Sequence, residues 1–370
     1  MISPSFFCGQ LKDLGVGFYS GVPDSLLKNL CAYITDTVPA KDNIIAVNEG
    51  CAVGLASGYH IATGKIPVVY MQNSGLGNAT NPLLSLADED VYNIPMILII
   101  GWRGEPGVHD EPQHVKQGKV TCELLKTMGI PYVVLSDEEN ECKDQMKVCK
   151  EHLEKKGSPF AFVVRKNTFS EYKLPSPVDS NPMSREQAIE IIADNVGDAV
   201  FVSTTGMASR ELYEIRERKG QGHGSDFLTV GCMGHASQIA LGIALNTDRK
   251  VVCIDGDGAV LMHMGGMATI ATRSPKNYVH IMINNGVHDS VGGQPTVSRD
   301  IDVTGIAKSV GYRKVFSVSD VESLKEVLCE KEGPVFIEVM VHRGARADLG
   351  RPKSTPVENK EALMKTIGGI

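Results

Sequence analysis

The stretch that decides the fold consists of KVVCIDGDG at residues 250–258 and YVHIMINNG at residues 278–286. Each segment begins with an apolar run that predicts a buried strand, and Met262–Thr272 between them predicts a helix. The stretch therefore predicts a β-α-β unit. In such a unit Asp257 and Asn285 follow the two strands at their carboxyl ends, where open α/β sheets bind their ligands.

The residue types at these strand ends suit a divalent cation held against a diphosphate. Asp257 offers a carboxylate oxygen and Asn285 an amide oxygen, both hard ligands, and glycines let the backbone approach phosphate oxygens closely. Asn284 is an alternative ligand, but we favour Asn285 because Gly286 follows it. Gly-Asp-Gly alone is an ordinary turn sequence. The specific signal is the whole order of strand, GDG, helix, strand and NNG.

A second pattern lies in the N-terminal half, where residues 43–59 read NIIAVNEGCAVGLASGY. A short apolar strand is followed by Glu49, which begins a helix of small residues that can pack closely on a sheet. The Gly-rich segment QNSGLGN follows at 72–78. By itself, Glu49 could be only the first-turn acid of a helix, stabilised by the helix dipole.

Taken together, the two patterns resemble the two signatures of thiamine diphosphate enzymes. This resemblance implies thiamine diphosphate and Mg²⁺ as cofactors, with Glu49 as the catalytic acid that binds the aminopyrimidine ring. It implies Asp257, Asn285 and the backbone carbonyl of Val287 as metal ligands. The other cofactor-binding residues it implies are Asn78, Thr204, Thr205, Gly206, Met233, Gly256, Gly258 and Ala259. The threonines could equally cap the next helix, and Met233 could simply fill space.

Apolar, β-rich runs alternate with helical patterns along the whole chain, which predicts parallel sheets with helices on both faces. The runs are 16–20, 44–47, 68–71, 96–100, 132–135 and 161–165, and then 199–203, 227–230, 251–255, 279–284, 314–317 and 335–341. Three prolines mark a connector between the two sets. We therefore expect an α/β fold of two similar doubly wound domains: a pyrimidine-binding domain at 1–173, a linker at 174–183 and a diphosphate-binding domain at 184–370.

Composition describes an ordinary globular chain. Of 370 residues, 42% are apolar and 22% charged, and the net charge of −7 argues against a nucleic-acid surface. The longest apolar run, 95–100, is far too short to span a membrane. No basic, apolar leader opens the chain, so we expect no secretory signal. The nine cysteines lack CxxC pairs, and we expect reduced thiols in a cytoplasmic protein.

Within the thiamine diphosphate superfamily, the two-domain length resembles the phosphonopyruvate and sulfopyruvate decarboxylases. GWRGEPGVHDEPQH at 101–114 and RADLGRPKSTP at 346–356 resemble the phosphonopyruvate decarboxylase family. That resemblance implies decarboxylation of 3-phosphonopyruvate to phosphonoacetaldehyde and CO₂, a step toward phosphonates such as 2-aminoethylphosphonate. Sulfopyruvate decarboxylase is the alternative. Because sulfopyruvate enzymes often divide the two domains between chains, the continuous chain favours phosphonopyruvate.

An anionic 2-keto acid requires local cations in a chain of net negative charge. Arg103 and His109 follow the strand at 96–100, and arginine binds phosphonate oxygens through two parallel hydrogen bonds. We expect both residues in the substrate site, with His109 also a candidate for proton transfer. The other predicted substrate-binding residues are Ser25, Asn73 and Arg346. Ser25 or Asp24 could instead cap a helix, and Arg351 and Lys353 are more simply read as a solvated tail.

Two other classes of protein are alternatives. A dinucleotide-binding oxidoreductase would need a GxGxxG after its first strand, and none is present. A non-catalytic thiamine-binding protein would be expected to lack Glu49 or Asp257. The family resemblance also implies a homo-oligomer with active sites between subunits, so that Glu49 and Asp257 act from different chains.

Overall fold

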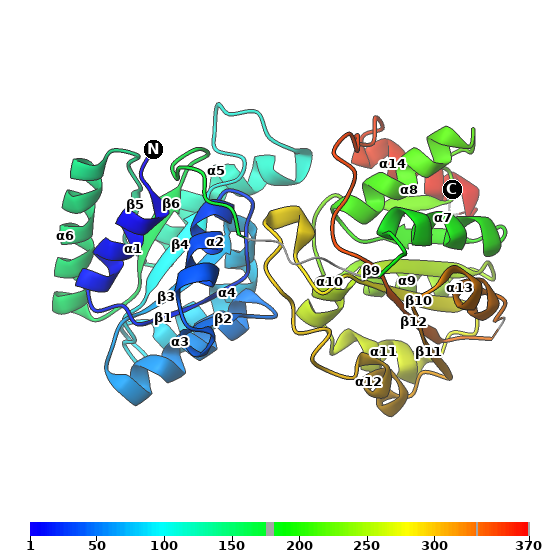
Figure 1. The fold of residues 1–370 in the computed structure, drawn as a ribbon, viewed down its shortest axis with the longest axis horizontal. Coiled ribbons are helices and arrows are strands. Elements are labelled where there is room, and N and C mark those ends of the chain that lie inside the picture. Colours follow the sequence, from blue (N-terminus) through cyan, green and yellow to red (C-terminus); the bar gives the residue numbers. More distant parts are fainter. Residues whose placement is uncertain (175–180, 331, 369–370) are drawn as a thin grey trace. The chain divides into compact units, whose positions relative to one another are not determined.

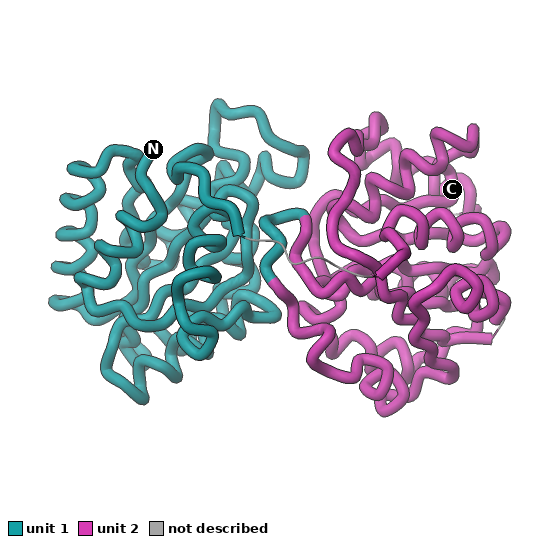
Figure 2. Tube along the Cα trace, viewed as in Figure 1, with its two compact units in different colours: residues 1–176, 290–294 teal, residues 177–289, 295–370 magenta. Residues whose placement is uncertain are grey.

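The computed structural model describes residues 1–174, 181–330 and 332–368. The chain divides into two compact units, shown in Figure 2. Unit 1 contains Met1–Ser176 and Ser290–Gln294, and unit 2 contains Pro177–Asp289 and Pro295–Ile370. Most of the linker predicted at 174–183 lies outside the described residues, so the predicted domain limits stay a prediction.

Unit 1 is built on one sheet. Its strands are β1 (Phe18–Gly21), β2 (Asn43–Ile45), β3 (Pro67–Gln72), β4 (Ile97–Gly101), β5 (Tyr132–Val134) and β6 (Phe160–Val164). Its helices are α1 (Pro4–Asp13), α2 (Lys28–Thr37), α3 (Glu49–Thr63), α4 (Leu76–Pro82), α5 (Pro112–Thr127) and α6 (Glu139–Lys156) (Figure 1). Short helical turns lie at Ala40–Asp42, Asn73–Gly75 and Leu83–Ala87.

Unit 2 repeats this plan. Its strands are β7 (Val200–Ser203), β8 (Asp226–Leu228), β9 (Val251–Gly256), β10 (Tyr278–Asn284), β11 (Lys314–Val318) and β12 (Val335–Met340). Its helices are α7 (Arg185–Asn195), α8 (Met207–Arg218), α9 (Ala236–Ala244), α10 (Asp257–Met262), α11 (Gly266–Arg273), α12 (Val303–Val310), α13 (Val321–Leu328) and α14 (Pro356–Thr366). A short turn of helix at Asp289–Val291 begins at the last residue of a unit 2 segment and continues into the Ser290–Gln294 segment of unit 1.

The two sheets have the same strand order. Unit 1 runs β2-β1-β3-β4-β6-β5, and unit 2, read from its β8 edge, runs β8-β7-β9-β10-β12-β11. Every pairing between neighbouring strands of the two sheets is parallel. The predicted doubly wound α/β fold is thereby confirmed, and each of the twelve predicted apolar runs overlaps a strand.

Helices cover both faces of each sheet, so that alternate residues of one strand pack into two different hydrophobic cores. Val68 and Tyr70 of β3 lie in a core with α1, α2 and α6, whereas Val69 and Met71 lie in a core with α3, α4 and α5. Unit 2 has the same two-sided arrangement, with one core against α7, α8 and α13 and another against α9, α11 and α12. Buried parallel strands therefore read as continuous apolar runs, which is why the sequence predicted them.

The helix predicted at Met262–Thr272 is the one clear departure. The structure has two helices there, α10 and α11, with His263 leaving helical geometry at φ −133° and ψ 45°. Gly265 and Gly266 follow after Met264, and glycine is a poor helix former. Within the described residues, no helix is long and apolar enough to cross a membrane.

Candidate active site

The GDG and NNG segments meet at one edge of the unit 2 sheet. β9 and β10 are adjacent and parallel, with Gly256 paired to Ile283, so Asp257 and Asn285 follow at the same carboxyl edge. Both side chains are buried, at 3% and 5% exposure. The residues that follow the two strands are therefore held close to one another by strand register alone.

Hydrogen bonding separates the two candidate asparagines. Asn284 is completely buried: its Nδ2 donates to Glu338 at 2.8 Å, and its Oδ1 accepts from Ser298 Oγ at 2.8 Å. Asn285 instead donates from Nδ2 to Asp289 at 2.8 Å and accepts at Oδ1 from the backbone N–H of Val287 at 3.1 Å. Asn284 is committed to the interior, which supports the choice of Asn285 as the ligand.

The chemistry of Asp257 fits a divalent cation. Its Oδ2 accepts hydrogen bonds from the hydroxyls of Thr296 and Ser298, and no cationic side chain in the described part of the chain pairs with it. Burial raises the pKa of the Asp257 carboxyl, and these hydrogen bonds only partly offset that rise. A buried carboxylate without a countercharge is one that a bound metal ion would stabilise. The donor set therefore fits Mg²⁺.

Glycines keep space open around the GDG turn. A Cβ on Gly258 would lie 2.9 Å from His288 Cε1 and 3.2 Å from Met233 Cε. A Cβ on Gly256 would touch Thr204 at 4.0 Å. Met233 and Thr204, which the sequence placed at the cofactor, thus lie against the glycines of the predicted diphosphate site.

The loop after β7 is held in a conformation that needs glycine. Gly206 is the N-cap residue of α8, and its φ of +92° is a backbone conformation that disfavours other residues. The Thr205 hydroxyl donates to the backbone oxygen of Val230 at 2.7 Å, while the backbone N–H of Thr204 donates to Ile254. Thr205 therefore ties two strand ends together. Gly258 and the buried Ala259 lie in the first turn of α10.

Glu49 of unit 1 lies in a fitted recess. It begins α3, which Asn48 caps by accepting from the backbone N–H of Cys51 at 2.9 Å. Glu49 is 5% exposed, and its Oε2 accepts from Asn78 Nδ2 at 2.8 Å. A Cβ on Gly75 would lie 2.5 Å from Glu49 Oε1. Asn78, predicted to bind cofactor, thus also orients the Glu49 carboxylate.

Arg103 and Ser25, both predicted in the substrate site, are brought together. Arg103 donates from Nη1 to Ser25 Oγ at 2.8 Å and from Nε to Asp110 Oδ2 at 2.8 Å. Burial alone would raise the pKa of Asp110, but hydrogen bonds from Arg103, Glu111 and Gly104 and the Arg103 charge hold it well below its usual value. Asp110 therefore stays ionised and offsets part of the Arg103 charge.

The loop beneath Arg103 is fixed by buried polar groups. Asn73 is 1% exposed; its Nδ2 donates to the Arg103 carbonyl at 2.8 Å and to Thr121 Oγ1 at 2.9 Å. Its Oδ1 accepts from the Arg103 N–H at 3.2 Å. Asn73 is thus fully used in positioning Arg103, so a role in substrate binding would be indirect. Asp24, rather than Ser25, makes the turn before α2, accepting from Leu26 N at 2.9 Å.

His109 and Arg346 have very different surroundings. His109 is exposed in the loop that follows β4, without a hydrogen-bond partner among the described residues. The guanidinium of Arg346 in unit 2 contacts Glu186, Glu214 and Asp348. Three carboxylates already surround Arg346, so its geometry does not support the predicted role in binding a substrate anion.

Two histidines near these residues carried no clear sequence signal. His114 is buried in the first turn of α5, and its Nδ1 has no partner in the described structure. Burial, together with the Arg103 charge, lowers the pKa of His114. Burial also lowers the pKa of His288 to about 4. A single histidine gives no pattern in the sequence; only the folded chain places His114 near Arg103 and His288 against Gly258.

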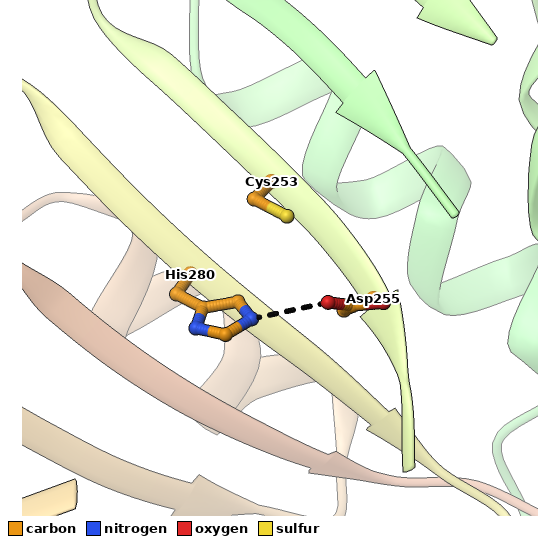
Figure 3. Close-up of side chains that lie close together, drawn as sticks. All are labelled: Cys253, Asp255 and His280. Carbon is orange, nitrogen blue, oxygen red and sulfur yellow. Dashed lines mark ion pairs between the residues drawn. The ribbon is translucent and has the colours of Figure 1, made fainter. Parts of the chain in front are cut away.

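Behind the GDG turn lies a buried polar cluster, shown in Figure 3. Cys253 and Asp255 of β9 and His280 of β10 have their ligand-type atoms within 4.8 Å of one another. Asp255 Oδ2 lies 3.5 Å from His280 Nε2, and Asp255 Oδ1 accepts from Gly256 N at 3.2 Å. Burial raises the pKa of the Cys253 thiol well above its usual value, which disfavours the thiolate that metals bind. We interpret the cluster as a support for the GDG turn.

Comparison with known families finds matches in both units. Residues 5–134 match the N-terminal TPP binding domain of thiamine pyrophosphate enzymes, and residues 204–339 match their C-terminal TPP binding domain. The first range contains Glu49 and the Arg103 loop, and the second contains the GDG and NNG segments. The chain therefore has both domains that bind thiamine diphosphate.

Individual relatives match along nearly the whole chain. Phosphonopyruvate decarboxylase of Streptomyces viridochromogenes is 35% identical over 97% of this chain and 93% of its own. The Streptomyces hygroscopicus protein of the same name is 36% identical over 97% and 92%. Sulfopyruvate decarboxylase of Methanosarcina acetivorans is 28% identical over 96% and 95%. This chain is a thiamine diphosphate-dependent decarboxylase, and it belongs to the phosphonopyruvate decarboxylase family.

Proposed function

We propose that this enzyme uses thiamine diphosphate and Mg²⁺ to convert 3-phosphonopyruvate into phosphonoacetaldehyde and CO₂, in the biosynthesis of phosphonates such as 2-aminoethylphosphonate. The observation that carries the proposal is the match of two phosphonopyruvate decarboxylases at 35% and 36% identity over 97% of the chain. Arg103, with Ser25 and Asn73 beside it, supplies a cation of the kind that such a substrate needs.

When bound, thiamine diphosphate supplies the carbanion and the electron sink for decarboxylation. The chain holds and orients this group. Asp257, Asn285 and the Val287 carbonyl would bind the metal at the diphosphate, and the glycines around Asp257 would admit the phosphate oxygens. Asn78 orients Glu49 by a hydrogen bond, and the missing side chain of Gly75 leaves space for its carboxylate. Glu49 would hold a proton at the aminopyrimidine ring.

Arg103 is the proposed recognition group for the phosphonate. Its guanidinium carries five N–H donors, and Ser25 and Asp110 accept three of them. The remaining donors are available to an anion, and Asp110 fixes the plane of the guanidinium. His109, exposed on the same loop, is our proposed proton donor during product formation. We leave Arg346 out of the proposed substrate site.

Sulfopyruvate decarboxylase is the second candidate, supported by the relative from Methanosarcina acetivorans, which matches 96% of this chain. That relative spans both domains in one chain. Chain continuity therefore does not distinguish the two activities, contrary to the expectation from sequence. What can distinguish them is charge, since a sulfonate is a monoanion and a phosphonate can be a dianion.

We further propose that the enzyme is a cytoplasmic homo-oligomer whose active sites lie between subunits. The cytoplasmic location is supported by the nine cysteines, all of which are free thiols in the structure. The oligomer is supported by the family resemblance, in which the residues equivalent to Glu49 and Asp257 act from different chains. Sedimentation of the purified chain at several concentrations tests the assembly, because a monomer with full turnover would contradict it.

The deciding experiment measures aldehyde formation by the purified chain with Mg²⁺ and thiamine diphosphate. Phosphonopyruvate, sulfopyruvate and pyruvate are compared at equal concentrations. We expect kcat/KM for phosphonopyruvate to exceed both others by at least about tenfold, the effect of one good charged contact. A preference for sulfopyruvate would establish the second candidate. Turnover of pyruvate alone would remove the anion-binding role of Arg103.

A further inference from the structure

We propose that Asp289 is a positioning residue that sets the orientation of the Asn285 carboxamide and thereby strengthens metal binding. This inference rests on the proposed function, since it assigns Asn285 to the metal. Asp289 lies just beyond the NNG segment, at the start of a short helical turn. Nothing in the sequence pattern distinguishes it from an ordinary surface aspartate.

Three donors converge on one oxygen of Asp289. Its Oδ2 accepts from Asn285 Nδ2 at 2.8 Å, from the backbone N–H of Gly344 at 2.9 Å and from Arg185 Nη1 at 3.1 Å. These donors come from the residue after β10, the segment after β12 and the start of α7. The Asp289 carboxylate is thus held from three directions, with 14% of its side chain exposed.

The Arg185 side of this arrangement is anchored in the interior. Arg185 donates from Nε to Glu211 Oε2 at 2.8 Å and from Nη2 to Glu211 Oε1 at 3.0 Å. Side-chain exposure is 8% for Arg185 and 1% for Glu211. A two-bond, buried pair of this kind has little freedom to move. Arg185 therefore presents its third nitrogen to Asp289 in a fixed direction.

The chemistry of the partners determines which way the Asn285 amide faces. An ionised aspartate can only accept hydrogen bonds, so the amide nitrogen of Asn285 must face Asp289. The backbone N–H of Val287 can only donate, so the amide oxygen must face Val287, and that bond is 3.1 Å long. The oxygen, which is the atom a hard cation needs, is therefore turned toward the residue whose carbonyl is the third predicted ligand.

Without Asp289, the amide could rotate and present its nitrogen at the metal position. Outer-shell partners of metal ligands typically change affinity by about 10- to 100-fold when removed. We expect Asp289→Ala to weaken Mn²⁺ binding by about tenfold or more. Asp289→Asn, which keeps one acceptor oxygen, should give a smaller loss. In both variants Arg185 retains its two hydrogen bonds to Glu211, so the Arg185 charge remains paired.

The test is titration of the full-length chain with Mn²⁺ in saturating thiamine diphosphate, with free Mn²⁺ read by electron paramagnetic resonance. The matched control is Glu214→Ala. Glu214 likewise accepts from a backbone N–H of the C-terminal segment, that of Gly350, and pairs with an arginine, Arg346. In the described structure it makes no hydrogen bond or ion pair with Asn285. We expect the control to bind Mn²⁺ as tightly as the unaltered chain.

A double-mutant comparison separates positioning from general stability. If Asp289 acts through Asn285, the loss caused by Asp289→Ala should disappear when it is made in an Asn285→Ala background. Additive losses, or an Asp289→Ala affinity equal to that of the unaltered chain, would overturn this inference alone. Absence of Mn²⁺ binding by the unaltered chain would overturn the metal-dependent function as well.

Discussion

Units 1 and 2 have sheets of the same strand order, yet equivalent strand ends carry different chemistry. The third strands, β3 and β9, lead into QNSGLGN and GDG, and the fourth strands, β4 and β10, lead into the Arg103 loop and NNG. At these strand ends unit 1 thus presents amides and a guanidinium, with its Glu49 carboxylate after β2, whereas unit 2 presents hard oxygen ligands between glycines. One topology supplies equivalent positions, and the side chains alone decide what each unit binds.

The largest expected effect comes from removing the unit 1 acid. Glu49→Gln keeps the shape and the hydrogen bond from Asn78, but it removes the group that holds a proton. We expect kcat to fall by about 10²- to 10⁴-fold, as for other acid–base residues. Calorimetry should find thiamine diphosphate affinity within about tenfold of the unaltered chain. Full turnover in this variant would place the catalytic acid elsewhere.

Asp257→Asn is the matching change in unit 2. We expect Mn²⁺ affinity, measured in the presence of thiamine diphosphate, to fall by about 100-fold, because a charged metal ligand is lost. Without added metal, the same substitution should raise the thermal stability of the chain.

The sign follows from the pKa of Asp257, which burial raises above its value in the unfolded chain. Such an acid stabilises the fold at low pH, and that contribution is lost as pH rises through the folded-state pKa. At neutral pH the metal-free carboxylate is therefore costly, and we expect Asp257→Asn to raise Tm by about 2–4 °C. A lower Tm, measured by calorimetry without metal, would indicate that Asp257 is mainly structural.

Arg103→Ala tests whether unit 1 recognises the substrate anion. Charged hydrogen bonds contribute about 1.5–3 kcal/mol, so we expect KM for phosphonopyruvate to rise by about 10- to 100-fold. Arg103→Lys should recover only part of this loss, since lysine cannot bond Asp110 through a fork. Steady-state kinetics with both variants provide the measurement. An unchanged KM in Arg103→Ala would remove this residue from the substrate site.

Gly75→Ala asks whether the recess around Glu49 matters as much as the acid itself. The added Cβ would meet Glu49 Oε1 at 2.5 Å, so the carboxylate must shift. We expect kcat to fall by about tenfold, less than for loss of the acid, since small misplacements of reacting groups are costly. Gly54→Ala in α3 is the control, because no atom lies within 4 Å of its added Cβ. Equal kcat in the two variants would contradict the fitted recess.

The smallest effect is expected for Arg346→Ala in unit 2. Its guanidinium contacts three carboxylates of the same unit, and partly exposed ion pairs contribute little. We expect KM for phosphonopyruvate to change by less than about threefold. A rise comparable to that of Arg103→Ala would restore Arg346 as a substrate ligand and break the assignment of anion binding to unit 1.

Sequence patterns predicted the elements whose burial is continuous. Strands such as β4 and β10, buried at every position, appear as apolar runs, and Asp257 stands out because it follows such a run between glycines. The helix break at His263 was missed, because an apolar pattern that continues through Gly265 and Gly266 still resembles one helix.

Partnerships between distant segments could not be read from the sequence. Asp110 forms an ion pair with Arg103 within one loop. The course of that loop follows no helical or strand periodicity that a sequence could reveal. Asn73 was predicted to bind substrate, but its amide donates hydrogen bonds to the Arg103 carbonyl and to the Thr121 hydroxyl. Asp289 and Arg185 are 104 positions apart. Hydrogen bonds of this kind depend on three-dimensional register, for which a single sequence contains no local signal.

The shared strand order has a practical consequence at the far edges of the two sheets. β5 and β11 are equivalent edge strands, and each is less buried than the strands beside it. None of the candidate ligands follows either strand. These edges are therefore the places to attach a fluorophore or a surface tether, since such additions would leave the carboxyl ends of the central strands untouched.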